Sequence, residues 1–569
     1  MIKKKDKLRI AILGGGPSGL FIYKRLIEEA QSNFEITIFE RKELLGVGMP
    51  YSAEGAGHEH ITNVSDNEVP DFVNSIEEWA KTAPKKLLDE YAINVAEFNQ
   101  YKVLPRLFFG AYLHGQFDLL LAKAAKKGIR TTVKTNCAVD DVINKAKLNE
   151  VWILADQAVF KFDKVVISTG HNWPKKYEGL VDGYYDSPYP PSKIELKVNH
   201  PVAIKGSSLT AIDALRTLSR MNGNYSRDIN GKWIYKLNKA SSNFRLVMHS
   251  RNGMLPAVRF HLEDSHLKND SLLTITDFKK HKAKNKGFIS LDFVFEKDFK
   301  EILRVKDPSF YETIKELNVE GFVDKMMGMR EKLPPFELLA LEYQQAEKSI
   351  ARKESVYWKE ILAILSYSMN YPAKYFSAED MMRLQKKLMP LISIVIAFVP
   401  QSSCEELLAL HDAGVLSITA VDEDSRVEIE ENGGICYVYK DENGKEQSTF
   451  YQTFIDCVGQ PHLNFEQFPF QSLTLSKEIT SAKLKFNSAA TGKSQLGFNK
   501  SVELLADGEY YLKVPGIVIN DNFQIVNEKG KVNRNIFIMA VPYIGGFNPD
   551  YSGIDFCEEA SKRIIAKLK

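Results

Sequence analysis

A glycine-rich segment near the N-terminus has the residue types and spacing that could hold a pyrophosphate. The stretch "LRIAILGGGPSGL" places Gly14, Gly16 and Gly19 in a G-x-G-x-x-G frame directly after an aliphatic run. In this frame the first glycine makes a tight turn, the second lets the backbone approach phosphates, and the third allows close helix–strand packing. Pro17 and Ser18 would begin the helix, whose N-terminal N–H groups attract an anion.

The residues around these glycines complete a strand–helix–strand unit. Apolar residues at helical spacing follow the glycines, and a second aliphatic run ends in Glu40 and Arg41. A carboxylate about 20 residues beyond the last glycine accepts hydrogen bonds from ribose hydroxyls. The alternative is a glycine-rich turn without a ligand, but the strand–turn–helix context favours a dinucleotide site.

Composition narrows the class of protein. The chain has 569 residues, of which 44% are hydrophobic and 26% charged, as in soluble proteins of several domains. The net charge of +2 gives no field that favours nucleic acid, and the longest apolar run, 388–400, is too short for a bilayer. The five cysteines contain no C-x-x-C pair, which indicates free thiols and excludes a paired-cysteine redox centre. We expect a cytoplasmic protein without a metal site.

A long glycine-punctuated loop, 41–64, follows the first unit where an NAD dehydrogenase would begin its next helix. Such a loop suits FAD, whose ring must lie under a cover. The stretches "GVGMPYS…HITNV", "LPRLFFGAYL", "GSSLTAIDAL" and "SRNGMLPAVR" together resemble a family of bacterial FAD/NAD(P)-binding proteins. Its members are related to flavin-dependent monooxygenases of the urate-hydroxylase and amine N-hydroxylase kind. The resemblance implies FAD, with substrates that vary widely.

The resemblance also implies cofactor contacts beyond the glycine turn. The positions are Gly46, Gly48, Tyr51, Asn63, Arg106, Val139, Thr169 and Gly170. Arg106 would lie near the cofactor phosphates or the flavin edge, and Val139 would hold the adenine through backbone groups. Thr169 and Gly170 belong to "VVISTG", which resembles the passage from an FAD domain to an NADPH domain. A turn for Asn63, a surface ion pair for Arg106 and strand packing for Val139 are the alternatives.

A second strand–helix–strand pattern spans 201–256. "PVAIKG" runs into a helix that begins at Leu209 and Thr210, but the glycine frame reads Gly206, Ser208 and Ala211. Ser208 puts a side chain where the backbone should meet a pyrophosphate, although its hydroxyl can donate to a phosphate. This loop is either a weakened nucleotide site or a fold element without a ligand.

The end of the next strand indicates which nucleotide this second unit would take. Ser250 and Arg251 stand where an NAD-binding unit has an acid. A hydroxyl and a guanidinium bind the 2′-phosphate of NADPH, whereas a carboxylate would repel it. The alternative is that Arg251 simply begins a turn.

These segments predict an α/β protein with two Rossmann-like dinucleotide-binding domains, for FAD and NADPH, and a largely α-helical insertion. We place the FAD domain at 1–195 and 461–569, the second domain at 196–260 and 391–460, and the insertion at 261–390. The insertion would line a substrate site, act as a lid or mediate assembly, and its lysine run is interpreted as a solvated face. "ISIVIAFV" is predicted as a strand, and 422–459 as hairpins.

The C-terminal stretch 535–568 resembles the closing segment of FAD enzymes, in which a helix directs its N-terminus at the flavin. Gly545, Gly546 and Gly553 are its candidate contacts. Val541 and Pro542 stand where the commoner form has Gly-Asp, whose acid binds a ribityl hydroxyl.

The sequence therefore favours an FAD-dependent oxidoreductase of the monooxygenase type, in which NADPH reduces the flavin and a small molecule is hydroxylated. We expect neither a nucleic-acid nor a membrane partner. Two alternatives stay open. One is a flavoprotein reduced by its own substrate, with the second domain as scaffold, and the other is a flavin- or nucleotide-binding sensor or assembly protein. No nucleophile–base pair is visible, so catalytic residues are unassigned, as is the oligomeric state.

Overall fold

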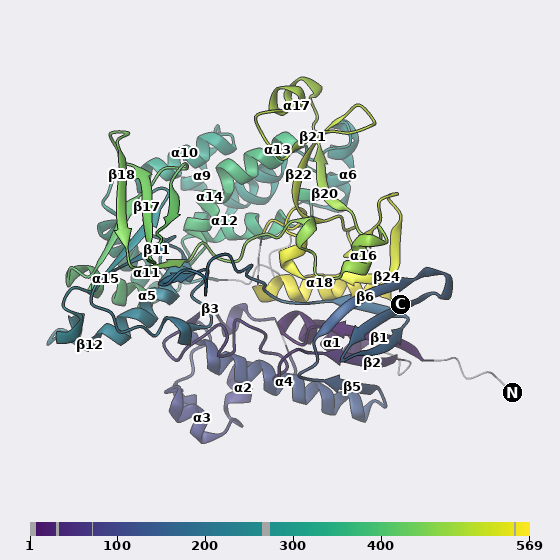
Figure 1. Ribbon diagram of the computed structural model, residues 1–569, viewed down its shortest axis with the longest axis horizontal. Coiled ribbons are helices and arrows are strands. Elements are labelled where there is room, and N and C mark those ends of the chain that lie inside the picture. The colour runs from purple at the N-terminus through teal and green to yellow at the C-terminus, as the bar shows by residue number, and fades with distance from the viewer. Residues whose placement is uncertain (1–6, 30–33, 71, 264–272, 551–552, 569) are drawn as a thin grey trace.

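Two separate, mostly parallel sheets organise the chain (Figure 1). The computed structural model describes residues 7–29, 34–70, 72–263, 273–550 and 553–568. The first sheet has the order β23 (Gln524–Val526), β24 (Val532–Ile538), β9 (Lys164–Ile167), β1 (Leu8–Leu13), β2 (Phe34–Phe39) and β5 (Arg130–Lys134). Only the β23–β24 pair is antiparallel. The C-terminal strands thus close the same sheet that the N-terminal strands begin.

Long helices cover the first sheet. They are α1 (Pro17–Glu29), α4 (Arg106–Lys126) and the C-terminal α18 (Gly553–Leu568), with the short α2 (Ile76–Ala80) and α3 (Lys85–Glu90) beside α4. Helices α1 and α18 pack together, and Glu558 on α18 forms ion pairs with Lys24 and Arg25 on α1. The two ends of the chain are therefore held in one unit.

The second sheet repeats the parallel pattern. Its order is β10 (Tyr184–Tyr185), β19 (Thr453–Asp456), β11 (Pro201–Lys205), β14 (Arg245–Ser250) and β15 (Leu416–Ala420). Helices α5 (Leu209–Asn222) and α15 (Gln401–Asp412) pack with it through an apolar core. The predicted α/β class with two Rossmann-like sheets is confirmed.

The turns after β1 and β11 have the same backbone geometry. Gly14 has φ +106° and Gly206 has φ +105°. The N–H of Gly14 donates to the carbonyl of Phe39 at 2.8 Å, and the N–H of Gly206 donates to the carbonyl of His249 at 2.8 Å. In both turns the accepting carbonyl lies at the end of the neighbouring strand, β2 or β14. The two sheets therefore present equivalent turns at the carboxyl ends of their strands.

A helical region lies between β14 and β15 in the sequence, as predicted. Its helices are α6 (Ile275–Lys284), α7 (Leu291–Phe295), α8 (Glu301–Lys306), α9 (Pro308–Ile314), α10 (Val319–Arg330), α11 (Pro335–Arg352), α12 (Tyr357–Ser368), α13 (Ala378–Arg383) and α14 (Met389–Val395). Several begin at a side chain that caps the first turn, such as Thr274, Ser290 and Asn318. Part of this region shares one apolar core with the C-terminal segment.

The smaller sheets are antiparallel. They consist of β3 (Ile61–Ser65) with β4 (Val103–Pro105); β6 (Val139–Lys145), β7 (Glu150–Ala155) and β8 (Ala158–Phe162); β12 (Gly223–Arg227) with β13 (Trp233–Leu237); β16 (Arg426–Ile429), β17 (Ile435–Lys440) and β18 (Glu446–Tyr451); and β20 (Ser481–Lys485), β22 (Tyr510–Ile517) and β21 (Val502–Leu504). Two short helices, α16 (Gln471–Leu475) and α17 (Ala489–Gln495), complete the C-terminal part. The hairpins predicted at 422–459 are confirmed by β16, β17 and β18.

The strand predicted at 392–399 is wrong. Helix α14 takes in this run as far as Val395 and Ile396 caps it, so no strand forms there, and Val399 makes only an isolated bridge with Val258. Short apolar runs fit a buried helix as well as a buried strand, and Leu391, Ile392 and Val395 are buried at helical spacing. Between β5 and β6, Asn136 takes φ +52°, and the two strands belong to different sheets.

Candidate functional site

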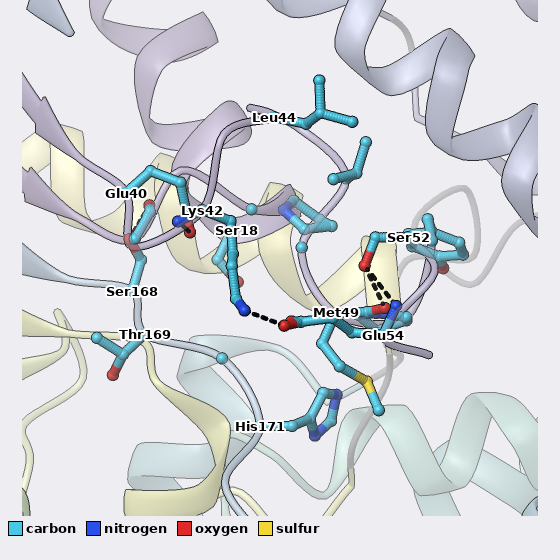
Figure 2. Close-up of a pocket in the computed structure, with 18 of the residues that line it drawn as sticks. Ser18, Glu40, Lys42, Leu44, Met49, Ser52, Glu54, Ser168, Thr169 and His171 are labelled. Atoms are coloured by element: carbon cyan, nitrogen blue, oxygen red, sulfur yellow. Dashed lines mark hydrogen bonds and ion pairs between the residues drawn. The ribbon is translucent and has the colours of Figure 1, made fainter. Parts of the chain in front are cut away.

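A cavity of about 470 Å³ lies at the carboxyl edge of the first sheet (Figure 2). Its walls are the glycine turn after β1, the loop 40–54, the turn 168–171 after β9, and parts of 539–557. This is the edge at which open parallel sheets bind ligands. The volume lies within the range of about 300–1,000 Å³ that small-molecule sites occupy.

The glycine turn leaves backbone donors free at this cavity. Gly14, Gly16 and Ser18 line it, and the first N–H groups of α1, those of Ser18 and Gly19, have no acceptor among the described residues. Gly16 is close to the covering loop, because a Cβ there would lie 3.1 Å from the Cα of Gly48. A helix N-terminus with free N–H groups beside a cavity is suited to a pyrophosphate.

Gly19 does not line the cavity but lies in the contact between helix α1 and the glycine turn. A Cβ at this position would lie 2.1 Å from the carbonyl oxygen of Gly14. The third glycine of the frame therefore permits the close packing of α1 on β1, as the pattern predicts.

Glu40 stands at the end of β2 and lines the cavity. Its Oε2 accepts from the N–H of Gly15 at 2.8 Å, and its Oε1 accepts from the N–H of Lys42 at 2.9 Å. A carboxylate has about four acceptor positions, so two remain for hydroxyl donors. The backbone thus fixes the orientation of the acid at the place where a ribose would need it.

Two buried polar atoms in the cavity wall have no partner. They are Oγ1 of Thr169 and Nδ1 of His171, neither of which is hydrogen-bonded within the described residues. Burial lowers the pKa of His171, so its imidazole is neutral. Because unpaired buried polar atoms are costly, this wall fits a ligand that supplies hydrogen bonds.

The loop 41–54 covers the cavity. Lys42 and Glu54 form an ion pair across it, and Arg41 lies 4.0 Å from the same carboxylate. Tyr51 belongs to this loop and lines the cavity, and burial raises its pKa to about 12. Gly46 has φ +85° and lies against the carbonyl of Leu113 on α4. The loop therefore rests on α4, as a cover over a cofactor requires.

The C-terminal segment supplies the remaining wall. Val541, Pro542, Gly553 and Cys557 line the cavity, so the pair that replaces the usual Gly-Asp does reach the site. The thiol of Cys557 lies 3.3 Å from Oγ of Ser18, which joins the N-termini of α18 and α1.

The structure divides the predicted site residues into two groups. Those that line the cavity are Gly14, Gly16, Pro17, Ser18, Glu40, Arg41, Gly48, Tyr51, Thr169, Gly170 and Gly553. Those outside its wall are Gly19, Gly46, Asn63, Arg106, Val139, Gly206, Ser208, Leu209, Thr210, Ser250, Arg251, Gly545 and Gly546. Gly545 packs instead against the ring of His462, and Gly546 against β22. For each residue, contact with a cofactor stays a prediction.

Sequence reasoning missed several wall residues. They are Lys42, Glu43, Leu44, Val47, Met49, Pro50, Ser52, Ala53, Glu54, Met539, Ile554 and Cys557. Most belong to the loop that was expected to cover the site, so the length of that loop was the available signal.

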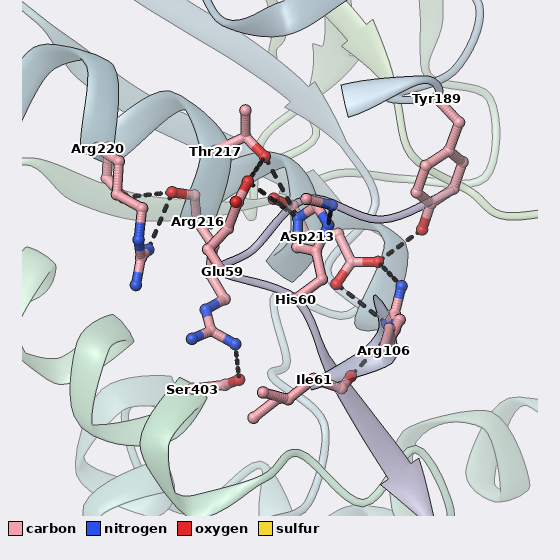
Figure 3. A network of polar contacts seen from close by, with 12 residues as sticks. Glu59, His60, Ile61, Arg106, Tyr189, Asp213, Arg216, Thr217, Arg220 and Ser403 are labelled. Atoms are coloured by element: carbon pink, nitrogen blue, oxygen red, sulfur yellow. Dashed lines mark hydrogen bonds and ion pairs between the residues drawn. The ribbon is translucent and has the colours of Figure 1, made fainter. Parts of the chain in front are cut away.

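Arg106 lies in a buried network that joins the two sheets (Figure 3). Its guanidinium donates to both carboxylate oxygens of Asp213 on α5, at 2.6 and 3.1 Å, and its Nε donates to the carbonyl of Ile61 at 3.0 Å. The Tyr189 hydroxyl donates to the same carboxylate at 2.6 Å. The ion pair weighed for Arg106 is confirmed, but it is buried between domains rather than on the surface.

Other predicted positions also have partners within the protein. The carbonyl of Asn63 accepts a hydrogen bond from Arg259, and Val139 pairs with Ala155 across β6 and β7. His60, beside this network, is buried, and its Nε2 lies 3.1 Å from the carbonyl oxygen of Asp213. Burial lowers the pKa of His60, although nearby Asp213 acts in the opposite direction.

The second glycine turn and the end of β14 carry polar side chains for which no hydrogen bond is found within the described residues. Ser208 occupies the N-cap position of α5, yet its side chain makes no capping hydrogen bond. Ser250 and Arg251 begin a turn in which the N–H of Gly253 donates to the carbonyl of Ser250 at 3.1 Å, and Arg251 is exposed. The turn weighed for Arg251 is therefore present, and its guanidinium has no hydrogen-bond or ion-pair partner among the described residues.

Comparison with known proteins assigns the class of the first domain. Residues 11–172 match the family described as FAD-NAD(P)-binding. This part of the chain is therefore an FAD-NAD(P)-binding domain, and the predicted family resemblance and cofactor class are confirmed. The remaining cavity wall, from 539 to 557, comes from outside the matched residues.

Two further matches concern the rest of the chain. Residues 274–396 match the YdhS-like middle domain, which covers most of the helical region. The uncharacterized protein YdhS of Escherichia coli (strain K12) is 29% identical over 472 residues, which cover 82% of this chain and 85% of that protein.

Solved structures match this chain only at low identity. The ornithine hydroxylase PvdA of Pseudomonas aeruginosa shares 12% identity with a TM-score of 0.46, covering 99% of this chain and 100% of that one. The ornithine N-hydroxylase KtzI of Kutzneria sp. 744 shares 11%, with a TM-score of 0.44 and 99% of each chain covered. None of the described helices is long and apolar enough to cross a membrane.

Proposed function

We propose that the protein is an FAD-dependent oxidoreductase of the monooxygenase type, in which NADPH reduces the flavin and a small molecule is hydroxylated. The observation that carries the proposal is the pair of equivalent glycine turns, one at the carboxyl edge of each sheet. One turn borders the cavity of the FAD-NAD(P)-binding domain. The other would receive the nicotinamide nucleotide.

The first turn and its neighbours would hold FAD. The N–H groups at the start of α1 would bind the pyrophosphate, and Glu40 would accept from the ribose. Thr169 and His171 offer the unpaired atoms that a bound cofactor would satisfy. When bound, FAD supplies the transfer of electrons from NADPH to oxygen or another acceptor.

The covering loop would exclude water from the reacting centre. Tyr51 and Met49 form part of the wall under the ion pair of Lys42 and Glu54. Exclusion of water protects a reduced cofactor from unproductive reactions. Neutral His171 is placed to accept or donate a single hydrogen bond at this wall.

The second turn would bind NADPH. The hydroxyl of Ser208 has no partner among the residues the structure describes, so it is available to a phosphate. Arg251 would pair with the 2′-phosphate, which NADH lacks.

Anaerobic reduction tests the proposal. The purified protein should carry flavin absorbance, and NADPH should bleach it faster than NADH. Arg251→Ala should raise the NADPH concentration needed for half-maximal rate by about tenfold, the effect of losing one charge-assisted contact. The exposed Arg352→Ala is the matched control and should leave the rate unchanged.

The same experiment decides against the proposal if neither nucleotide reduces the flavin within minutes. The favoured function would then be a flavoprotein that is reduced by its own substrate, with the second sheet as scaffold. Absence of flavin, together with no binding of added FAD, would reject the enzyme class altogether. Oxygen consumption with trial metabolites then separates hydroxylation from simple peroxide release.

A further inference from the structure

A second cavity, of about 290 Å³, lies where four parts of the chain meet. Its walls come from the β3–β4 excursion (Ser65 and 99–103), the segment 259–262 after β14, Ile350 on α11, and the start of α15. It shares no wall residue with the cavity of the FAD-NAD(P)-binding domain. The polar and charged groups of its wall indicate what this second cavity could bind.

The N-terminus of α15 opens into this cavity. The helix has 12 residues, its N-cap residue is Pro400, and no side chain caps its first turn. No described residue accepts from the N–H groups of Gln401, Ser402 or Ser403, and Gln401 and Ser402 line the cavity. Free N–H groups and the helix dipole together favour a negative charge at this place.

An unpaired buried histidine faces the same space. His261 lines the cavity and is only 8% exposed, yet neither ring nitrogen is hydrogen-bonded within the described chain. Its ring packs against that of Tyr101 with the centroids 4.9 Å apart. Burial lowers the pKa of His261, so the neutral ring has one N–H to donate. This donor in the cavity wall is available to a ligand.

The two positively charged side chains of the cavity wall differ in whether they can pair with a ligand. Arg259 is 4% exposed and is held by Glu68, Ser65 and the carbonyl of Asn63, so it forms a fixed wall. The ammonium group of Lys102 has no ion-pair partner among the described residues. This lysine is therefore free to pair with an anion.

One carboxylate also borders the space. Glu405 is one turn into α15, and its Oε1 accepts from the Tyr343 hydroxyl at 3.2 Å. The anionic group of a ligand would therefore lie at the helix N-terminus, between His261 and Lys102, with the rest of the molecule toward Glu405.

We propose that this cavity binds a small organic anion through a carboxylate or phosphate group. The free N–H groups of α15 and the ring of His261 would donate to the anion, and Lys102 would balance its charge. The site is separate from the proposed reduction of flavin by NADPH. Because its walls come from four parts of the chain, a bound anion would also hold them together.

Calorimetric titration of the flavin-loaded protein with inorganic phosphate, and separately with succinate, tests this site. Both titrations are made in chloride buffer at constant ionic strength. Binding of phosphate alone, or of succinate alone, identifies the group that the site takes. Either result supports the proposal, and absence of binding by both overturns it.

Variants locate the binding. His261→Phe keeps the ring and removes its donor, and should raise the dissociation constant about tenfold. Lys102→Met should raise it about threefold, because this charge is exposed. Lys529→Met removes an exposed lysine elsewhere and should change nothing.

Ser402→Asp gives a test that does not depend on damage to the fold. A carboxylate in the first turn stabilises a helix, so this variant should melt no lower than the parent protein. It would also occupy the anion position and abolish binding. Anion binding that survives this change lies elsewhere and refutes the assignment. Reduction by NADPH should be unaffected, so the two proposals fail independently.

Discussion

Replacing Asp213 with asparagine should weaken the contact between the two sheets more than any exposed substitution. Asp213 is 5% exposed and receives two hydrogen bonds from Arg106 and one from Tyr189. Burial alone would raise the pKa of Asp213, but Arg106 and His60 lower it, so the carboxylate is charged. The asparagine leaves the guanidinium buried without a counter-charge.

The loss of the counter-charge sets how much stability the Asp213→Asn variant should lose. Removing one partner of a buried ion pair costs about 3–5 kcal/mol, and asparagine retains one acceptor, so we expect about 3 kcal/mol. At about 2–4 °C per kcal/mol for a large domain, the melting temperature should fall by about 6–12 °C. Scanning calorimetry at neutral pH measures this shift.

A double variant supplies the control. Arg106→Met with Asp213→Leu removes both charges and leaves no unpaired charge, although the Tyr189 hydroxyl and the Ile61 carbonyl each lose a partner. It should therefore be more stable than Asp213→Asn alone. The reasoning is refuted if Asp213→Asn melts within about 2 °C of the parent, the range expected of a surface change.

Three further predictions concern single positions. Gly19→Ala should yield protein without flavin absorbance, because its Cβ would meet the carbonyl of Gly14, whereas Ala211→Gly at the equivalent position should fold normally. Glu40→Gln should weaken FAD binding about tenfold, measured by recovery of flavin fluorescence, and an unchanged affinity would contradict the ribose role. Burial lowers the pKa of His249 to about 4, so its contribution to stability is complete above pH 6.5 and is lost as the pH falls toward 4. The parent should lose about 2 kcal/mol between pH 7 and pH 5 through this group, and His249→Phe, compared by urea unfolding, should not.

The sequence predicted the parts of the site that a short segment specifies. The glycine turn, its helix and Glu40 lie within 8–40, and each has a residue type that its backbone position requires. The loop after them was predicted as a cover from its length and glycines. Its individual wall residues, such as Met49 and Glu54, follow only from the path of the loop over α4.

The features that the sequence did not predict depend on contacts between segments that are far apart in the chain. Arg106 and Asp213 are 107 residues apart, and neither lies in a pattern that identifies the other. The second cavity likewise draws its wall from four separate stretches. Helix α14 was mistaken for a strand because it is apolar along its length, which local periodicity does not resolve.

The helical region leaves and rejoins the second sheet at one narrow base. The N–H of Arg259 donates to the carbonyl of Val399 at 2.8 Å, and the N–H of Val399 donates to that of Ala257 at 2.9 Å. The two ends of the segment 260–398 are thus side by side, which is the arrangement that lets whole domains be exchanged without changing strand order. A short turn joined at this seam would link the two ends, but it would expose the apolar surface that the helical region buries against the C-terminal segment. Different helical regions grafted there would give hybrid proteins that share one nucleotide-binding frame.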